Sequence, residues 1–280
     1  RICAIGTSAG GVQALGRWFE HLPGDLGLAY VVILHLSPDH HSEIAEMLRH
    51  RTSMPVTAVE GTEDIEANHV YVISPDRGLV LRDGRLETFP FVSITQRRTT
   101  NDIFLRSLAA ERPDPIAVIL TGAGADGSLG VKAVKEAGGI VLVQTPSDAE
   151  FPSMPESAIA AGVADIVLPL PDLVTQFTRI ASAPEGARGA LPSERPLDHA
   201  DALQTILNEL RIRTGHDFSH YKRSTVLRRI ARRLQLTNCE DLDSYREYLR
   251  TNEDEPRNLL GDLLLSVTSF FRDAGAFQSL

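Results

Sequence analysis

Residues 1–15, RICAIGTSAGGVQAL, place a serine in a glycine-rich turn between an apolar run and a helical pattern. The run at residues 2–5 predicts a buried strand, and the pattern after Gly11 predicts a helix over residues 12–20. Such a turn serves one of two chemistries. It binds a phosphate through backbone N–H groups at the helix start, or it presents Ser8 as a nucleophile. A structural alternative is that Ser8 simply caps the helix.

The same alternation of apolar run and helix continues to about residue 181. Further strands are predicted at residues 30–34, 70–73, 116–120, 140–143 and 166–168, apolar throughout as in strands covered on both faces. Helices are predicted between them at residues 42–49, 100–110, 127–137 and 156–161. Asp83-Gly84 between two short runs indicates a hairpin. The pattern therefore predicts an α/β domain, with a doubly wound, mainly parallel sheet and one antiparallel hairpin.

The composition changes at residues 182–197, SAPEGARGALPSERPL, which are rich in Pro, Gly, Ala and Ser and predict a linker. Residues 198–280 contain no β-rich run and predict a small all-α domain. Its helices are expected at residues 200–214, 221–235, 242–251 and 257–265, with a last one starting near Ala274. Asp241 and Pro256 are candidate helix starts. The expected domains are thus 1–181 and 198–280.

Composition excludes several classes of protein. Of the 280 residues, 42% are apolar and 23% charged, as in globular proteins, and the net charge of −9 disfavours nucleic acid as a general partner. The longest apolar run, residues 28–34, is too short to span a membrane. Cys3 and Cys239 do not make a disulfide framework, so we expect a protein of the reducing cytoplasm.

A serine, a histidine and an aspartate each follow a predicted strand. Ser8 follows the first, His35 the second, and Asp126 the strand at residues 116–120. Carboxyl ends of parallel strands meet at one edge of a sheet, where ligands bind. The three residues therefore indicate a Ser–His–Asp triad, which is recognised by geometry and not by chain order. Each also has a structural interpretation, since Asp126 could cap the helix predicted after it and His35 could be a polar strand end.

Two other chemistries fit less well. The spacing Gly-x-Ser-x-x-Gly departs from the dinucleotide fingerprint, no acidic residue ends the second strand, and no Gly-Lys-Ser/Thr is present for a nucleoside triphosphate. A metal site would have to use the loop with Asp39, His40, His41 and Glu43. That loop lacks the defined ligand spacing of a zinc site, so no metal is expected.

The first half resembles the catalytic domain of the bacterial chemotaxis protein-glutamate methylesterases. AIGTSAGGVQAL, VVILHLSP, HVYVISPDRGLVLRDGRL, AVILTGAGADGSLGVKAVKEAGG and MPESAIAAG carry the resemblance, in order, across residues 1–181. It implies hydrolysis of glutamate γ-methyl esters on chemoreceptors, and in some members glutamine deamidation. It also implies Ser8 as nucleophile, His35 as base and Asp126 as the group that orients His35, with no metal or cofactor.

The chain departs from that family beside the triad. Ala9 stands where threonine is frequent, Ala123 where methionine is common, and Leu34-His35 where a Gln–His pair is common. Backbone N–H groups of Ala9 and Ala123 can still bind an oxyanion, because an N–H does not depend on the side chain. The departures bear on substrate preference and rate, and they leave a second hypothesis open: a receptor-docking module whose esterase site is inactive.

A basic segment marks the helical half, HYKRSTVLRRIARRLQL. Val226, Leu227, Ile230 and Leu234 share one helical face, and the remainder carries six basic side chains: Lys222, Arg223, Arg228, Arg229, Arg232 and Arg233. They indicate a docking surface for an acidic partner, or a solvated charged face partly neutralised by Glu253-Asp254-Glu255. Nucleic acid is disfavoured by the overall charge.

This half resembles the N-terminal helical domain of the chemotaxis receptor methyltransferases, through DFSHYKRSTVLRRIARRL, YREYL and LLLSVTSFFRDAGAFQSL. The resemblance implies that the basic helix faces methylated receptor helices. It also implies an edge of an S-adenosylmethionine site at Thr268 and Arg272, with Ser266 where asparagine is common. We therefore expect a fused methylesterase–methyltransferase in which these 280 residues remove methyl groups but do not add them.

Overall fold

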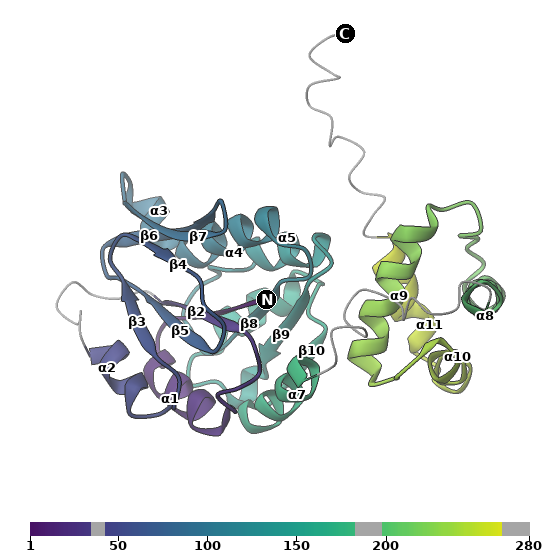
Figure 1. Cartoon of the computed structure of the whole chain (residues 1–280), viewed down its shortest axis with the longest axis horizontal. Coiled ribbons are helices and arrows are strands. Elements are labelled where there is room, and N and C mark those ends of the chain that lie inside the picture. The colour runs from purple at the N-terminus through teal and green to yellow at the C-terminus, as the bar shows by residue number, and fades with distance from the viewer. Residues whose placement is uncertain (35–42, 183–197, 265–280) are drawn as a thin grey trace, which may run out of the picture. The chain divides into compact units, whose positions relative to one another are not determined.

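The computed structural model describes residues 1–34, 43–182 and 198–264, and the chain divides into two compact units, Arg1–Ser182 and Ala183–Leu280. A parallel sheet of seven strands forms the centre of the first unit (Figure 1). Its order is β10-β9-β8-β1-β2-β5-β3. The strands are β1 (Ile2–Thr7), β2 (Ala29–Leu34), β3 (Val56–Val59), β5 (His69–Ile73), β8 (Ile116–Ile119), β9 (Ile140–Gln144) and β10 (Ile166–Leu168).

A small antiparallel sheet accompanies the parallel one, in the order β4-β7-β6. It consists of β4 (Thr62–Asp64), β6 (Arg77–Arg82) and β7 (Arg85–Pro90). Asp83 and Gly84 join β6 to β7 with φ of 50° and 77°, the two positive values that a tight type I′ turn requires. The expected hairpin is therefore present, with β4 as a third strand.

Helices cover both faces of the parallel sheet, as continuous apolar strands demand. In Figure 1, α1 (Gly11–His21), α2 (Glu43–Arg49) and α7 (Leu170–Ser182) lie below the sheet. Above it lie α3 (Ile94–Arg98), α4 (Thr100–Glu111) and α5 (Gly130–Glu136). Between β9 and β10 the chain forms a short 3₁₀ turn, Pro146–Asp148, and α6 (Ser153–Ala160).

Aromatic side chains fix the lower layer to the sheet. The Trp18 and Phe177 rings lie 5.2 Å apart, and Phe177 also packs on Tyr30 of β2 at 6.2 Å. Trp18, Tyr30 and Phe177 are all completely buried. This cluster holds α1 and α7 against the centre of the sheet, so the turn that carries Ser8 starts from a rigid base.

Two strands and two α-helices of this unit were not predicted from the sequence: β3, β4, α3 and α7. The short 3₁₀ turn was not predicted either. The strands β3 and β4 are short and only partly buried, and α3 buries no residue. None of the three therefore produces an apolar period. One predicted strand also differs in character, because β10 lies at the edge of the sheet and its residues are half-buried or exposed rather than covered on both faces.

The second unit is helical in its described part. Its elements are α8 (Asp198–Thr214), α9 (Arg223–Thr237), α10 (Leu242–Thr251) and α11 (Glu255–Leu264). They bury one core that includes Ile206, Leu210, Ile230, Tyr245 and Leu249. Ser182 ends α7, whereas the rest of the expected linker, 183–197, and the helix expected near Ala274 lie outside the described residues.

Candidate active site

The turn after β1 presents Ser8 without using its side chain for structure. Gly10, not Ser8, is the N-cap residue of α1, and no side chain caps that helix. Gly10 has φ of 74°, a left-handed conformation that glycine adopts without strain. Ser8 is half-buried, and its hydroxyl has no hydrogen-bond partner among residues 1–34, 43–182 and 198–264. The structural interpretation of Ser8 as a helix cap is therefore wrong.

The loop after β8 is fixed beside this turn. The Thr7 hydroxyl donates to the carbonyl of Thr121 over 2.7 Å, and the Ser8 N–H donates to the same carbonyl over 3.2 Å. Gly122 passes so close that a Cβ built on it would lie 3.0 Å from Ser8 Cβ and 2.5 Å from the sulfur of Met154. Only glycine fits at this position, which brings the following loop residues against the serine.

Asp126 is held by the helix that precedes it in sequence, not by the one that follows. Its Oδ2 accepts from the backbone N–H and the side-chain amide of Asn101, both over 2.9 Å, and its Oδ1 accepts from the N–H of Asp102 over 3.0 Å. These amides are orphan donors in the first turn of α4. The expectation that Asp126 could cap the helix predicted at residues 127–137 is thus corrected, since α5 begins only at Gly130.

The Asp102 carboxylate in turn accepts hydrogen bonds from the start of α5. Its Oδ1 accepts from the N–H groups of Leu129 and Gly130, over 3.0 and 2.7 Å. Burial raises the pKa of Asp102; the N–H of Gly130 acts in the opposite direction, and the neighbouring Asp126 carboxylate adds to the rise. Asp126 therefore binds the first turn of α4, and Asp102 of α4 binds the start of α5. Asp126 is thereby fixed in position, and its carboxylate still has acceptor capacity left.

The topology explains why these groups meet. β8, β1 and β2 are adjacent and parallel, so the residues after them emerge at one edge of the sheet. From β1 the chain passes to β2 on one side, and it returns to β8 on the other side only after β7. The gap between β1 and β8 is therefore a topological switch point, the usual ligand position in open α/β sheets.

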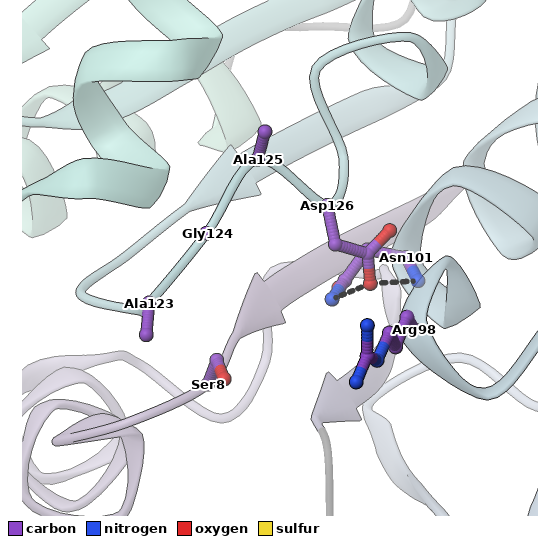
Figure 2. A pocket seen from close by; sticks show the side chains of 7 residues that line it. All are labelled: Ser8, Arg98, Asn101, Ala123, Gly124, Ala125 and Asp126. Carbon is purple, nitrogen blue, oxygen red and sulfur yellow. Dashed lines mark hydrogen bonds between the residues drawn. The ribbon is translucent and has the colours of Figure 1, made fainter. Parts of the chain in front are cut away.

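A pocket of about 310 Å³ opens at this point. Its lining consists of Ser8, Arg98, Asn101, Ala123, Gly124, Ala125 and Asp126 (Figure 2). The backbone N–H groups of Ala9 and Ala123 have no acceptor within the described part of the chain. The pocket is thus lined by a residue with a free hydroxyl, Ser8, a residue with an unused amide, Ala123, and a fixed carboxylate, Asp126, and the unused amide of Ala9 follows Ser8 directly in the chain. These are the groups that acyl transfer requires.

Several predicted site residues lie outside the part of the chain that the structure describes. His35 lies outside the described residues, as do Asp39, His40 and His41 of the loop considered for metal, and the side chain of Glu43 is not described either. Ser266, Thr268 and Arg272, expected to border S-adenosylmethionine, lie in 265–280, also outside. Among the residues that are described, no group of three or more His, Cys, Asp or Glu could hold a metal ion.

The structure adds two residues that the sequence did not indicate. Arg98 ends α3 and Asn101 lies in the first turn of α4, and both line the pocket. Asn101 is buried, and its side chain fills the space beside Gly6, where an added Cβ would lie 2.5 Å from the Asn101 Oδ1 atom. The only sequence signal was a polar stretch, QRRTTND, directly before the apolar residues of a predicted helix.

The basic segment of the second unit is not one exposed surface. Lys222, Arg223 and Arg228 are exposed, but Arg229, Arg232 and Arg233 are only 2%, 4% and 8% exposed, which corrects the expectation of six docking residues. Arg232 pairs with Asp262 of α11. Arg233 binds both carboxylate oxygens of Glu255, over 2.8 and 2.6 Å, and the Tyr245 hydroxyl donates to Glu255 over 2.7 Å.

Pairing with Glu255 also determines the ionisation of the buried Arg233 side chain. Burial disfavours the charged Arg233 guanidinium, but the hydrogen bonds and charge of Glu255 more than offset that and raise the pKa of Arg233. Burial and the same carboxylate raise the pKa of Tyr245. The acidic loop therefore does neutralise part of the basic helix, through Glu255, and Asp262 joins it from a position that was not anticipated.

Comparison with known proteins assigns the first unit to a family. The family model described as CheB methylesterase matches residues 3–177, well over half of the chain. The chain belongs to the CheB methylesterase family. Within that family's catalytic fold, the Thermotoga maritima CheB methylesterase catalytic domain superposes with a TM-score of 0.57 at 31% identity. That match covers 62% of this chain and 97% of the solved one.

Beyond the CheB region, residues 201–264 match the all-alpha domain of CheR methyltransferases. An uncharacterized 104.1 kDa protein of Rhodobacter capsulatus is 36% identical over 261 residues, 85% of this chain. The protein-glutamate methylesterase/protein-glutamine glutaminase 4 of Myxococcus xanthus is 34% identical over 179 residues, 63% of this chain. The chain spans only 27% and 51% of the lengths of these two relatives. In the described part, no helix is long and apolar enough to cross a membrane.

Proposed function

We propose that the CheB unit is a serine esterase that removes methyl groups from glutamate methyl esters of chemoreceptors. The observation that carries this proposal is the free Ser8 hydroxyl in a pocket that Asp126 and Ala123 also line. Membership of the CheB methylesterase family supplies the substrate class, which the geometry alone does not define. No metal or cofactor is needed for this chemistry.

In the proposed mechanism, His35 takes the proton of Ser8 while the serine Oγ attacks the ester carbonyl. Asp126 orients the imidazole and stabilises its charged form. The amides of Ala9 and Ala123 receive the oxyanion, and their function survives the side-chain changes at both positions. Protonated His35 then gives its proton to the leaving methoxide, which departs as methanol. Water, deprotonated by the same histidine, hydrolyses the acyl-serine to glutamate and regenerates the hydroxyl.

Glutamine deamidation is chemically close to this reaction. The same acyl-serine forms when ammonia leaves instead of methanol, so the proposed site needs no additional group for it. The Myxococcus xanthus relative is named for both activities. We propose the esterase as the principal activity, because an ester has the better leaving group.

Labelling with a fluorophosphonate, followed by peptide mapping, tests this function. A phosphonyl group on Ser8, blocked by prior incubation with methylated receptor, is the expected result. If Ser8 stays unlabelled while receptor still binds, the chain is a docking module with an inactive esterase site, the alternative that Ala9, Leu34 and Ala123 leave open.

For the second unit we propose docking to the cytoplasmic helices of chemoreceptors, through the exposed residues Lys222, Arg223 and Arg228. The match to the CheR all-alpha domain supports this assignment. We further propose S-adenosylmethionine as the cofactor of the methyltransferase part of a longer protein, with Thr268 and Arg272 at the border of its site and Ser266 as a weaker contact. The proposed compartment is the cytoplasm, where the receptor helices lie.

A further inference from the structure

Arg98 is a cation without a partner beside the nucleophile. Its side chain lines the same pocket as Ser8 and is exposed. Within the described ranges its guanidinium makes no hydrogen bond and no ion pair. Its neighbour Arg97 differs, because the Arg97 guanidinium pairs with Asp76 at 2.6 Å and lies over the Phe91 ring. No hydrogen bond or ion pair with a described residue therefore accounts for the position of Arg98.

The nearest carboxylate of the pocket does not neutralise Arg98. Asp126 directs both oxygens to donors of α4, and no ion pair joins it to Arg98 in the described residues. Arg98 and Asp126 are the charged side chains of the lining, whose other members are Ser8, Asn101, Ala123, Gly124 and Ala125. A guanidinium with five N–H donors in this setting is suited to a planar anion, and above all to a carboxylate.

The charges around Ser8 are also arranged asymmetrically. The Glu150 carboxylate lies against Gly10, close enough that a Cβ there would be 2.8 Å from its Oε2 atom. Arg98 lies on the side of Ser8 where Asp126 and Asn101 lie (Figure 2). Glu150 repels an anionic group of a bound substrate at the α1 side. At the other side Arg98 attracts it, because the Asp126 charge is already stabilised by the N–H donors of α4, whereas the guanidinium N–H donors of Arg98 have no acceptor among the described residues. A substrate with one acidic flank is thereby given a preferred orientation.

We propose that Arg98 is a specificity-determining residue that binds a carboxylate of the substrate protein next to the scissile ester. The inference rests on the esterase function proposed above and extends it to the residues around the methylated glutamate. The ester itself is neutral, so Arg98 gains an anionic partner before the reaction only from a flanking Asp or Glu. The carboxylate formed by hydrolysis is the other source of the same chemistry, and the experiment separates the two.

The experiment measures kcat/KM for methanol release by the full chain from methylated cytoplasmic fragments of a chemoreceptor. One fragment carries Glu within a helical turn of the methylated residue, and the other carries Gln at the same positions. The enzymes are the wild type, Arg98→Gln and the matched control Arg106→Gln, which removes an exposed charge of α4 outside the pocket. Inhibition by demethylated fragment is measured for each.

The wild type and Arg106→Gln are expected to prefer the Glu-flanked fragment by about tenfold, as an accessible charge-assisted contact allows, and high salt should reduce the preference. In Arg98→Gln the preference should fall to about onefold, and Arg98→Lys should restore part of it. An unchanged preference in Arg98→Gln overturns the inference while the esterase stands. Relief of product inhibition alone assigns Arg98 to the product and also overturns it. If neither fragment releases methanol with the wild type, both the proposed esterase function and the inference about Arg98 are overturned.

Discussion

At the scale of single residues, the structure separates the side chains that hold the turn from the one it leaves unused. Thr7 and Thr121 bond across the β1–β8 gap, and Gly10 supplies the left-handed φ, whereas the Ser8 hydroxyl contacts no described partner. Replacing Ser8 by Ala should therefore leave the free energy of unfolding within about 0.5 kcal/mol of the wild type.

The same substitution should abolish ester hydrolysis. Loss of a nucleophile disables the whole catalytic unit, so methanol release from methylated receptor should fall by on the order of 10³ or more. Denaturant unfolding of Ser8→Ala provides the control for an intact fold. Methanol release near the wild-type rate from the folded variant would contradict the assignment of Ser8.

The role proposed for His35 predicts how the rate depends on pH. A general base must be neutral, so kcat/KM should decrease as pH falls through the imidazole pKa, about 6.5 for an unperturbed histidine. Below that pH the loss should be tenfold for each further pH unit. A profile of kcat/KM against pH tests this, recorded on a small methyl ester over about three pH units around that pKa. A flat profile would exclude His35 as the base.

At the scale of elements, helix starts give the clearest test of local sequence signals. Asp241 was predicted as a helix start, and it caps α10 in a reciprocal box: its carboxylate accepts from the Ser244 N–H over 2.8 Å, and the Ser244 hydroxyl accepts from the Asp241 N–H. Asp241→Ala should lower the free energy of unfolding of the helical unit by about 1 kcal/mol.

The pH dependence of that cap has a defined sign. The Ser244 N–H stabilises the carboxylate and lowers the pKa of Asp241 below its usual 3.8. Its contribution is thus fully present above pH 3.8 and is lost as pH falls through the lower folded-state value. Asp243→Ala, in the same first turn but without the capping bonds, is the matched control. Denaturant midpoints of the two variants at neutral and acidic pH compare the effects, and equal losses would argue against the cap.

Elements with a regular apolar period were predictable, and those without one were not. The strands around β1, β2 and β8 and the position of Asp126 at their edge followed from apolar runs alone. α7 was omitted although Leu173, Val174, Phe177 and Ile180 form a clear helical stripe, so its signal was present in the sequence. α3 gave none, because it buries nothing, and Arg98 could not be placed in the pocket without it.

The burial of charged side chains is harder to predict from sequence patterns than the position of a strand or helix. The apolar stripe of α9 was predicted, but Arg229, Arg232 and Arg233 beside it were expected in solvent. Arg232 and Arg233 are paired with Asp262 and Glu255, which α11 brings from more than twenty residues away. A local pattern cannot distinguish a solvated arginine from one whose carboxylate arrives through tertiary packing.

At the scale of the whole molecule, the buried Arg233–Glu255 pair allows a test of whether the two units unfold independently. Arg233→Ala leaves the Glu255 carboxylate buried without its bidentate partner, a change that costs about 3–5 kcal/mol in comparable sites. The helical unit should unfold at lower denaturant concentration, while Ser8 keeps its reactivity because the CheB unit has its own core. Arg228→Ala, an exposed neighbour, is the control. Simultaneous loss of fluorophosphonate labelling would contradict independent stability.

The last prediction concerns docking by the residues that remain exposed. Reversing Lys222, Arg223 and Arg228 to Glu should weaken binding to receptor fragments, because the acidic receptor groups proposed as their partners would then meet like charge. Wild-type affinity should fall as salt rises, since exposed charges are screened, and the reversed variant should lose most of that dependence. The control reverses the exposed Arg246, Arg250 and Arg257, with the same change of net charge. Both variants should hydrolyse a small methyl ester at the wild-type rate, because Ser8 and its pocket are untouched. Equal receptor affinity of the two variants, measured by calorimetry at low salt, would remove this end of α9 from the docking surface.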